Sequence, residues 1–396
     1  MNAWAKLQVI GQYGRDVLGR HFLRRPPHNV RTYLSLRELP DRYHLLLPRY
    51  LSSPAHPLQI ITSSPSIISL RTYGKQLDHL ARLAYRCDDV YFSPKIPSST
   101  HNATLVHDGS NPALLERPWR KIVHLDFDIA QPPPLDQPWL ILPYQMHPFV
   151  YTRHQERHIP HWRQAARPIR LFFAGHWEQH AYATAPSILS LRERFGLFDR
   201  HTLIQALLDG LQDRLVEIRT MQDFQRLLHG DYSDRCVIAL NVGFLECRIP
   251  QQRWLEVLGR CDAFIAVPGT NTPLCHNLIE AMAVGTIPLT NYAPWLTPAL
   301  QDGHNCLTFQ TPAQLVTAAW TLLNMEPSTL ATMRHNVLTY HDHHLARSAF
   351  LDRLLHHPAP ELKLFVSTDD IPTWQRVNTS SVIIAGKYHP APALTS

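Results

Sequence analysis

Short apolar runs alternate with amphipathic segments through residues 169–290, and this alternation is the clearest pattern in the chain. The apolar runs are expected to be buried strands, and they occupy residues 169–174, 215–219, 237–240, 263–267 and 287–290. The intervening segments have helical chemistry and occupy residues 202–211, 222–229, 250–260 and 274–284. Strands that alternate with helices over this length predict an α/β domain with a parallel, doubly wound, Rossmann-like sheet.

The first 155 residues mix strands and helices less regularly, which predicts a second α/β domain. Strand-like runs lie at residues 59–62, 89–92, 103–107, 121–127 and 139–143, with a helix over 74–86. A segment rich in proline, arginine and histidine, 147–168, is typical of a connection between domains. Beyond the second domain, one or two helices are expected over 327–355 and a strand-like run at 381–385.

The chain has 396 residues and a formal charge of +6, so its length suits two domains and its charge favours anionic partners. Nucleotide diphosphates, nucleic acid and acidic lipid all meet that requirement. No basic patch interleaved with aromatic residues supports a nucleic-acid partner. The six cysteines include no CxxC pair, which predicts buried thiols in a reducing compartment and hence a cytoplasmic protein.

No run approaches 18 apolar residues, so no membrane-spanning helix is expected. Residues 1–25 place apolar side chains among five basic ones, Lys6, Arg15, Arg20, Arg24 and Arg25. This pattern fits a packed terminal helix with a solvated basic side. It also fits an amphipathic segment in peripheral contact with a membrane surface.

The segment after the strand at 263–267 predicts an anion-binding helix start. Its loop consists of Gly269, Thr270, Asn271 and Thr272. Thr272 is expected to cap the helix, with Pro273 at its first position, and Gly285 is expected just past its end. This helix start would lie at the carboxyl edge of the parallel sheet, where α/β folds bind ligands. Its free N–H groups suit a phosphate or diphosphate, and Gly269 would let the backbone approach it.

Three polar residues on this helix share a face. Glu280 lies four residues after His276 and three after Asn277, beside the apolar positions of the same helix. A carboxylate at that place can accept hydrogen bonds from vicinal hydroxyls, as on a ribose. The alternative is a solvated glutamate without a partner.

The sequence VPGTNTPLCHNLIEAMAVGTIPL, residues 267–289, resembles the donor motif of GT-B glycosyltransferases and is most similar to the exostosin-like families. The matching residues are Pro268, Gly269, Glu280, Ala281, Gly285 and Pro288. The run LFFAG at 171–175 resembles the strand that opens the exostosin C-terminal domain, so the likeness covers roughly residues 169–310. It departs from the retaining EX7E pattern, because Thr272 stands where that pattern has its first glutamate.

The resemblance implies a GT-B fold, in which two Rossmann-like domains face each other across a cleft. It implies an acceptor-side domain at 1–155, a nucleotide-sugar domain at 165–330, and C-terminal helices and a tail at 331–396 that pack back on the first domain. Glu280 would then hold the nucleotide ribose, and the loop before its helix would hold the diphosphate.

The implied activity is a hexosyltransferase-type glycosyltransferase of polysaccharide biosynthesis. It would move a sugar from a nucleotide-sugar donor to a hydroxyl of a saccharide or lipid-linked glycan, without a cofactor. Two alternatives share the donor site: a nucleotide-sugar epimerase, which converts its substrate without an acceptor, and a non-catalytic protein that binds nucleotide sugars or glycans.

Further donor contacts are expected after the strand at 169–174. Gly175 and His176 follow its end and would face the cleft. Arg192, Arg194 and Arg200 come next, and the arginine fork suits a phosphate. Arg192 is the first candidate, against the alternative of an ordinary solvated helix.

A general base that deprotonates the acceptor hydroxyl is expected from the first domain. Asp108 or His107 is the best placed, because the strand-like run 103–107 ends there and a loop begins. The alternative is an ordinary turn aspartate before Gly109. His147 is a second candidate base.

No resident metal is expected. Asp126 and Asp128 form a DxD pair, which holds a divalent cation in other glycosyltransferases, but a GT-B site usually needs none. The histidine-rich run 341–344 is expected to be a solvated helix end, because adjacent helical residues point in different directions.

Overall fold

The computed structural model describes residues 90–94, 121–126, 128–147, 150–151, 153–183, 185–240, 249–270, 272–367 and 371–385. The chain divides into two compact units, Met1–Leu125 and Asp126–Ser396. Strands β1 (Val90–Pro94) and β2 (Lys121–Asp126) pair in parallel, as two of the predicted runs require. The other elements predicted in the first unit, at 59–62, 74–86 and 103–107, lie outside the described residues.

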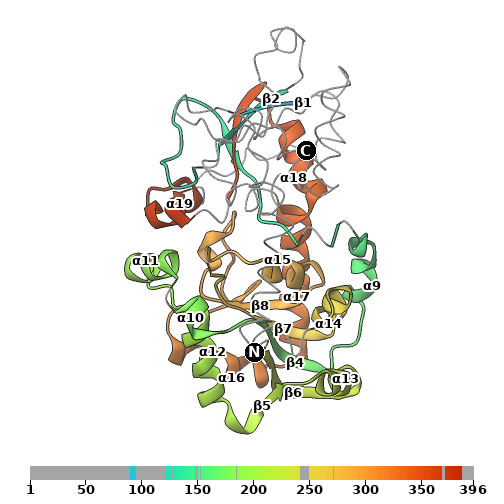
Figure 1. The fold of residues 1–396 in the computed structure, drawn as a ribbon. Helices are drawn as coiled ribbons and strands as arrows, with labels where there is room; N and C mark the ends of the chain where they lie inside the picture. The colour runs from blue at the N-terminus through green and yellow to red at the C-terminus, as the bar shows by residue number, and fades with distance from the viewer. Residues whose placement is uncertain are drawn as a thin grey trace, which may run out of the picture. The chain divides into compact units, whose positions relative to one another are not determined.

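The second unit is built on a six-stranded parallel sheet in the order β5-β6-β4-β7-β8-β9 (Figure 1). Its strands are β4 (Ile169–Gly175), β5 (Leu215–Ile218), β6 (Tyr232–Leu240), β7 (Cys261–Ala266), β8 (Ile287–Thr290) and β9 (Leu307–Thr308). All five strands predicted for this region are confirmed. The chain leaves central β4 toward one edge and returns to β7 on its other side, which makes the carboxyl ends of β4 and β7 the topological switch point.

Every residue of β7 and β8 is buried, which shows that both faces of the sheet are covered at these strands. Helix α16 contacts β4 and β6, whereas α15 contacts β7 and β8. The main helices are α11 (Pro186–Phe195), α12 (Arg200–Gly210), α13 (Met221–His229), α14 (Trp254–Gly259), α15 (His276–Ala283), α16 (Pro312–Leu323) and α17 (Pro327–Tyr340). Shorter turns of helix are η2 (Gln155–His158), α9 (Ile159–Arg163), α10 (Gln179–Tyr182), η3 (Gln212–Arg214), η5 (Gln251–Arg253) and η6 (Ala293–Trp295).

Helix starts follow from local sequence. Thr220 begins α13 and Thr311 begins α16, each in a reciprocal capping box with the residue three positions later. Asp199 caps α12, since its carboxylate accepts a hydrogen bond of 2.9 Å from the N–H of Thr202. This cap fixes the position of Arg200, the first residue of α12, immediately after the loop that follows α11.

The helices expected over 327–355 are confirmed as α17 and α18 (Arg347–His356), which are joined by a π-helical turn, η7 (His341–Leu345). The segment after α18 forms elements that the sequence pattern did not indicate. Strand β10 (Glu361–Phe365) then pairs in parallel with β3 (Trp139–Ile141). Helix α19 (Ile371–Arg376) contacts α11. The strand predicted at 381–385 is wrong, because Val382–Ala385 forms the short helix α20.

In the part of the chain that the structure describes, no helix combines the length and the apolar character needed to cross a membrane. The domain limits predicted from the sequence stay a prediction.

Candidate functional site

The loop between β7 and α15 turns back on itself at Gly269. The N–H of Gly269 donates to the carbonyl of Thr272 at 3.1 Å, and a Cβ atom on Gly269 would lie 2.8 Å from that same oxygen. The glycine is therefore required by the loop's own backbone, whereas the sequence suggested a close approach to a ligand. Thr270 is half-buried in this loop, and Asn271 lies outside the described residues.

Gly269→Ala is expected to lower the free energy of unfolding by about 1–3 kcal/mol, because the Thr272 carbonyl has to move away from the new methyl group. Chemical denaturation monitored by circular dichroism measures this loss. An unchanged midpoint would show that the loop relaxes freely and that its shape does not depend on the glycine.

Helix α15 begins three residues later than the sequence predicts. Its first residue is His276 and its N-cap is Cys275, so the predicted cap at Thr272 with Pro273 in the first turn is wrong. Thr272 instead accepts a hydrogen bond of 3.1 Å from the N–H of Leu274, a local turn that competes with helix formation. No described side chain caps α15, so the positive end of this helix is open to solvent or a ligand among these residues. The predicted glycine at the other end is confirmed, because Gly285 has φ +80°.

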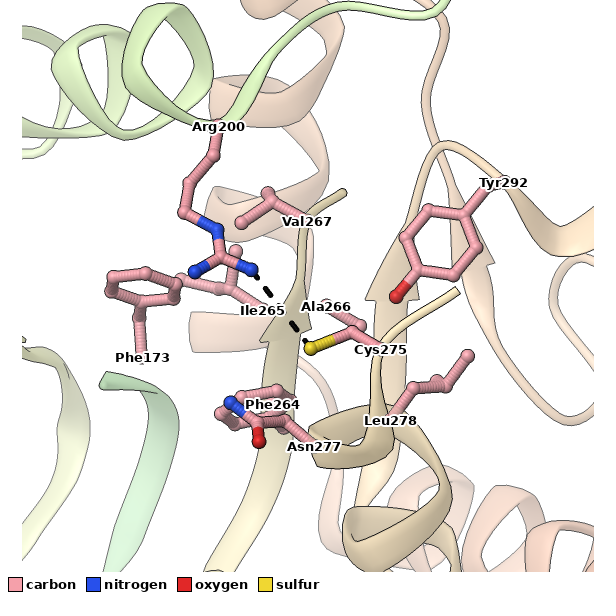
Figure 2. A pocket seen from close by; sticks show the side chains of 10 residues that line it. All are labelled: Phe173, Arg200, Phe264, Ile265, Ala266, Val267, Cys275, Asn277, Leu278 and Tyr292. Carbon is pink, nitrogen blue, oxygen red and sulfur yellow. Dashed lines mark hydrogen bonds between the residues drawn. The ribbon is translucent and has the colours of Figure 1, made fainter. Parts of the chain in front are cut away.

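A small pocket lies at the switch point, between the end of β4, the end of β7 and the start of α15 (Figure 2). It is lined by Phe173, Arg200, Phe264, Ile265, Ala266, Val267, Cys275, Asn277, Leu278 and Tyr292. The space in it that a water-sized sphere can enter is about 10 Å³. That is about the room that one bound water needs. The pocket therefore accepts a single oxygen-sized group, such as one oxygen of a phosphate.

Arg200 brings a buried positive charge to this pocket. Its Nε donates to the carbonyl of Pro268 at 3.0 Å, and its Nη1 donates to the carbonyl of His176 at 3.1 Å and to the hydroxyl of Tyr182 at 2.8 Å. Among the described residues, its Nη2 has only the Cys275 sulfur, 3.9 Å away, as a partner. No carboxylate of the described residues pairs with this guanidinium, although Arg200 is only 6% exposed. A buried cation without a counter-ion favours an anionic ligand.

Tyr292, just after β8, supplies a second polar group without a partner. The residue is fully buried, and within the described part of the chain its hydroxyl makes no hydrogen bond. Figure 2 shows this hydroxyl directed toward the pocket, across from Arg200. Buried hydroxyls are almost always hydrogen-bonded in folded proteins, so this one indicates a place for a polar ligand atom.

Glu280 is buried beside this pocket and does not line it. One carboxylate oxygen accepts from the backbone N–H of His147 at 2.9 Å, and the other accepts from the indole N–H of Trp254 at 2.6 Å. Burial raises the pKa of Glu280 to about 7, although both hydrogen bonds act to lower it. The alternative of a solvated glutamate is thus wrong, and the contact with a ribose stays a prediction.

The two other polar residues predicted on this helix, Asn277 and His276, have different surroundings. Asn277 lines the pocket. His276 lies on the side of His147 and Tyr144, with ring centroids 4.9 Å and 6.0 Å away. His147, the second candidate base, is also 3.3 Å from the amide nitrogen of Gln251, through its Nδ1. These rings join the segment before α9 to the start of α15.

Gly175 and His176 contribute to the site by positioning Arg200. A Cβ atom on Gly175 would lie 3.4 Å from the Arg200 guanidinium and 3.3 Å from the ring of Phe173. The backbone carbonyl of His176 accepts a hydrogen bond from Arg200. The imidazole Nε2 of His176 lies 3.5 Å from a carboxylate oxygen of Glu178.

The three arginines predicted as phosphate ligands have different surroundings. Arg192 is exposed on α11, with its guanidinium 4.8 Å from the centre of the Phe198 ring. Arg194 donates to the carbonyls of Trp374, at 3.2 Å, and Val377, and so attaches α11 to the C-terminal segment. Arg200 alone of the three lines the pocket. The sequence ranked Arg192 first, and its contact with a donor stays a prediction.

Asp126 and Asp128 are engaged in ion pairs. Lys363 lies 3.2 Å from Asp126, and Arg376 binds both oxygens of Asp128 at 3.0 and 3.1 Å. Among the described residues, no three carboxylate, histidine or cysteine side chains gather as a metal site would require. The candidate bases Asp108 and His107 lie outside the described residues.

The run 341–344 differs from the solvated helix end that the sequence suggested. His341 is buried, and burial lowers its pKa. Arg163 donates to both carboxylate oxygens of Asp342, at 2.6 and 2.8 Å. These contacts attach α9 to the π-helical turn.

No protein-family model matches the chain, and no curated protein sequence matches it. Among solved structures, the chain is similar to the pneumococcal O-GlcNAc transferase GtfA, crystallised with UDP and GlcNAc, at 9% identity and a TM-score of 0.30, covering 60% of this chain and 53% of that one. It is also similar to the G117R mutant of S. aureus TarM, at 8% identity and a TM-score of 0.32, covering 70% of this chain and 59% of that one.

A third similar structure is Anabaena Alr3699/HepE, crystallised with UDP-glucose, at 12% identity and a TM-score of 0.26, covering 70% of this chain and 75% of that one. The chain thus spans little more than half the length of the GtfA and TarM structures.

Proposed function

We propose that this protein is a glycosyltransferase that moves a sugar from a nucleotide-sugar donor to a hydroxyl of a saccharide or lipid-linked glycan. The observation that carries the proposal is the buried guanidinium of Arg200 at the switch point of a parallel sheet, where no carboxylate of the described residues pairs with it. The donor motif at 267–289, with its resemblance to exostosin-like GT-B enzymes, supports the same assignment.

In this proposal a phosphate of the donor binds at the small pocket and places one of its oxygens there. Arg200 donates to it through Nη2, the uncapped start of α15 faces it, and Tyr292 adds its hydroxyl. The pocket is too small for the rest of the donor, so the nucleoside and the sugar extend outward along the carboxyl edge of the sheet.

The ribose of the donor binds Glu280 in this proposal. Each carboxylate oxygen already accepts one hydrogen bond and has a further lone pair for a hydroxyl. Glu280 is 2% exposed, so the contact requires the backbone at His147 to move away from α15 when the nucleotide binds.

The pocket also explains how transfer is promoted. Negative charge develops on the leaving diphosphate, and Arg200 and the start of α15 stabilise it there. The acceptor hydroxyl loses its proton to a base from the first 155 residues, for which Asp108 and His107 are the candidates. No metal or cofactor takes part in this scheme. The protein acts in the cytoplasm, with residues 1–25 as its peripheral contact with a membrane surface.

A thermal-shift panel of UDP, GDP, ADP and dTDP tests the donor site. At 100 times its dissociation constant, a ligand that binds only the folded state stabilises it by about 2.7 kcal/mol. We expect one nucleoside diphosphate to produce such a shift, and the absence of a shift with all four would contradict the proposal.

The corresponding nucleotide sugars then distinguish transfer from epimerisation. We expect the sugar to leave the nucleotide only when an acceptor glycan is supplied. Conversion of the nucleotide sugar to its epimer in a donor-only incubation would identify an epimerase instead. Binding of the nucleotide sugar without either reaction, over a panel of acceptors, would identify a binding protein.

A further inference from the structure

Cys275 differs from the other described cysteines because its side chain reaches the pocket surface. Cys236, Cys261 and Cys306 are fully buried. Burial raises the pKa of Cys306 to about 12 and also raises the pKa values of Cys236 and Cys261. Thiols in such surroundings are inert. Cys275 is half-buried and lines the pocket between β7 and α15.

Two positively polarised features lie next to the Cys275 sulfur. The sulfur lies 3.9 Å from Nη2 of Arg200 (Figure 2), and no carboxylate in the described part of the chain pairs with that guanidinium. Cys275 is also the N-cap residue of α15, an eight-residue helix whose start no described side chain caps. A guanidinium and a helix N-terminus both attract negative charge, so an oxygen bound to this sulfur would find favourable partners.

The hydroxyl of Tyr292 is an independent sign that the pocket accepts an added polar group. It belongs to a fully buried residue, makes no hydrogen bond among the described residues and is directed toward the same space. An oxygen attached to the Cys275 sulfur would lie in the pocket that Arg200 and Tyr292 both line.

We propose that Cys275 is a reactive thiol of this pocket, that a peroxide oxidises it to a sulfenic acid, and that this modification blocks the phosphate subsite. The thiolate sulfur attacks one peroxide oxygen, an S–O bond forms, and the O–O bond breaks. The leaving oxygen takes a proton to become water or an alcohol. Sulfur is oxidised by two electrons and the peroxide is reduced, and an external thiol reverses the change.

The blocking effect follows from the size and charge of the pocket, and this part rests on the proposed function. The pocket has room for one small group, so an oxygen on Cys275 and a phosphate compete for the same space. A sulfenate would also place a negative charge next to the Arg200 guanidinium, which weakens the attraction of that guanidinium for a phosphate.

Differential alkylation tests the reactivity. The full-length protein is treated with limiting iodoacetamide, and peptides are quantified by mass spectrometry. Alkylation replaces iodide by sulfur on the reagent's carbon, and Cys275 is expected to react at least about 10-fold faster than Cys236, Cys261 and Cys306. A rate for Cys275 no greater than theirs would overturn the proposal.

The same labelling with saturating nucleoside diphosphate separates this inference from the proposed function. Slower alkylation of Cys275 in the presence of the nucleotide supports both the reactive thiol and the phosphate subsite. Rapid labelling of Cys275 that the nucleotide leaves unchanged, although it binds elsewhere or not at all, supports the reactive thiol and contradicts the phosphate subsite.

Peroxide treatment tests the block itself. Hydrogen peroxide is expected to reduce the thermal shift produced by the nucleotide in the wild type and in the control C236A, and dithiothreitol is expected to restore it. Dimedone, which traps sulfenic acids, should label Cys275. In C275S, peroxide should leave the shift of that variant unchanged. An equal loss of shift in C275S would overturn the proposal.

Discussion

Arg200→Met is expected to weaken nucleoside diphosphate binding by about 10- to 100-fold, the size of a lost hydrogen bond to a charged group. The expectation follows from the geometry of the guanidinium. Pro268, His176 and Tyr182 hold it in place, and its remaining N–H groups face the pocket. Methionine has a similar length and no charge, so it removes the cation and largely keeps the packing.

Isothermal titration calorimetry measures this loss, with circular dichroism to show that the variant is folded. Arg200→Lys serves as a second variant, since it keeps the charge and loses the fork. Arg192→Met is the matched control, because Arg192 is exposed on α11 over the Phe198 ring. If the Arg192 variant lost binding and the Arg200 variants did not, the phosphate subsite would be on α11.

Glu280→Gln is expected to change how stability depends on pH. In the wild type, the folded-state pKa of about 7 lies above the ordinary value of 4.5. Between these two pH values the folded protein holds a proton that the unfolded chain has lost. Stability therefore falls as pH rises from 4.5 to 7 and then levels off, by an amount on the order of 3 kcal/mol. Glutamine cannot titrate, so its pH profile lacks this decline.

Urea denaturation at pH 5 and pH 8 measures the difference in unfolding free energy between wild type and variant. The contributions of the other titrating groups cancel in that difference. Glutamine leaves one donor poorly satisfied, and we therefore expect the variant to be the less stable protein at pH 5. The difference in unfolding free energy between wild type and variant should be smaller at pH 8 than at pH 5. A difference that is the same at both pH values would show that Glu280 stays ionised throughout, and that burial does not govern its protonation.

The parallel sheet could be predicted because its strands are buried on both faces. Such strands appear in the sequence as continuous apolar runs, and the runs at 169–174, 263–267 and 287–290 became β4, β7 and β8. The pairing of β10 with β3 was not predictable in this way, because it joins segments more than 200 residues apart. The strand predicted at 381–385 was wrong for a different reason, because a short apolar run fits a buried helix as well as a strand.

The candidate site was predicted as a region and only partly as a set of residues. The Thr-Pro pair at 272–273 has the chemistry of a helix start, but a local turn at Leu274 delays the helix to His276. Spacing along the helix could not show that Trp254 and the backbone of His147 would enclose Glu280. Tyr292 gave no sequence signal at all, because only the fold directs its hydroxyl into the pocket (Figure 2).

Hydrogen–deuterium exchange with the nucleoside diphosphate that gives the largest thermal shift tests the central claim most directly. We expect it to slow exchange in peptides that cover residues 268–279, at the start of α15, and residues 287–294, around Tyr292. Peptides of β5 and α13, at the far edge of the sheet, serve as the internal control. Slowed exchange at both predicted segments would place the nucleotide at the switch point. Binding that leaves both segments unprotected would contradict a donor site centred on Arg200.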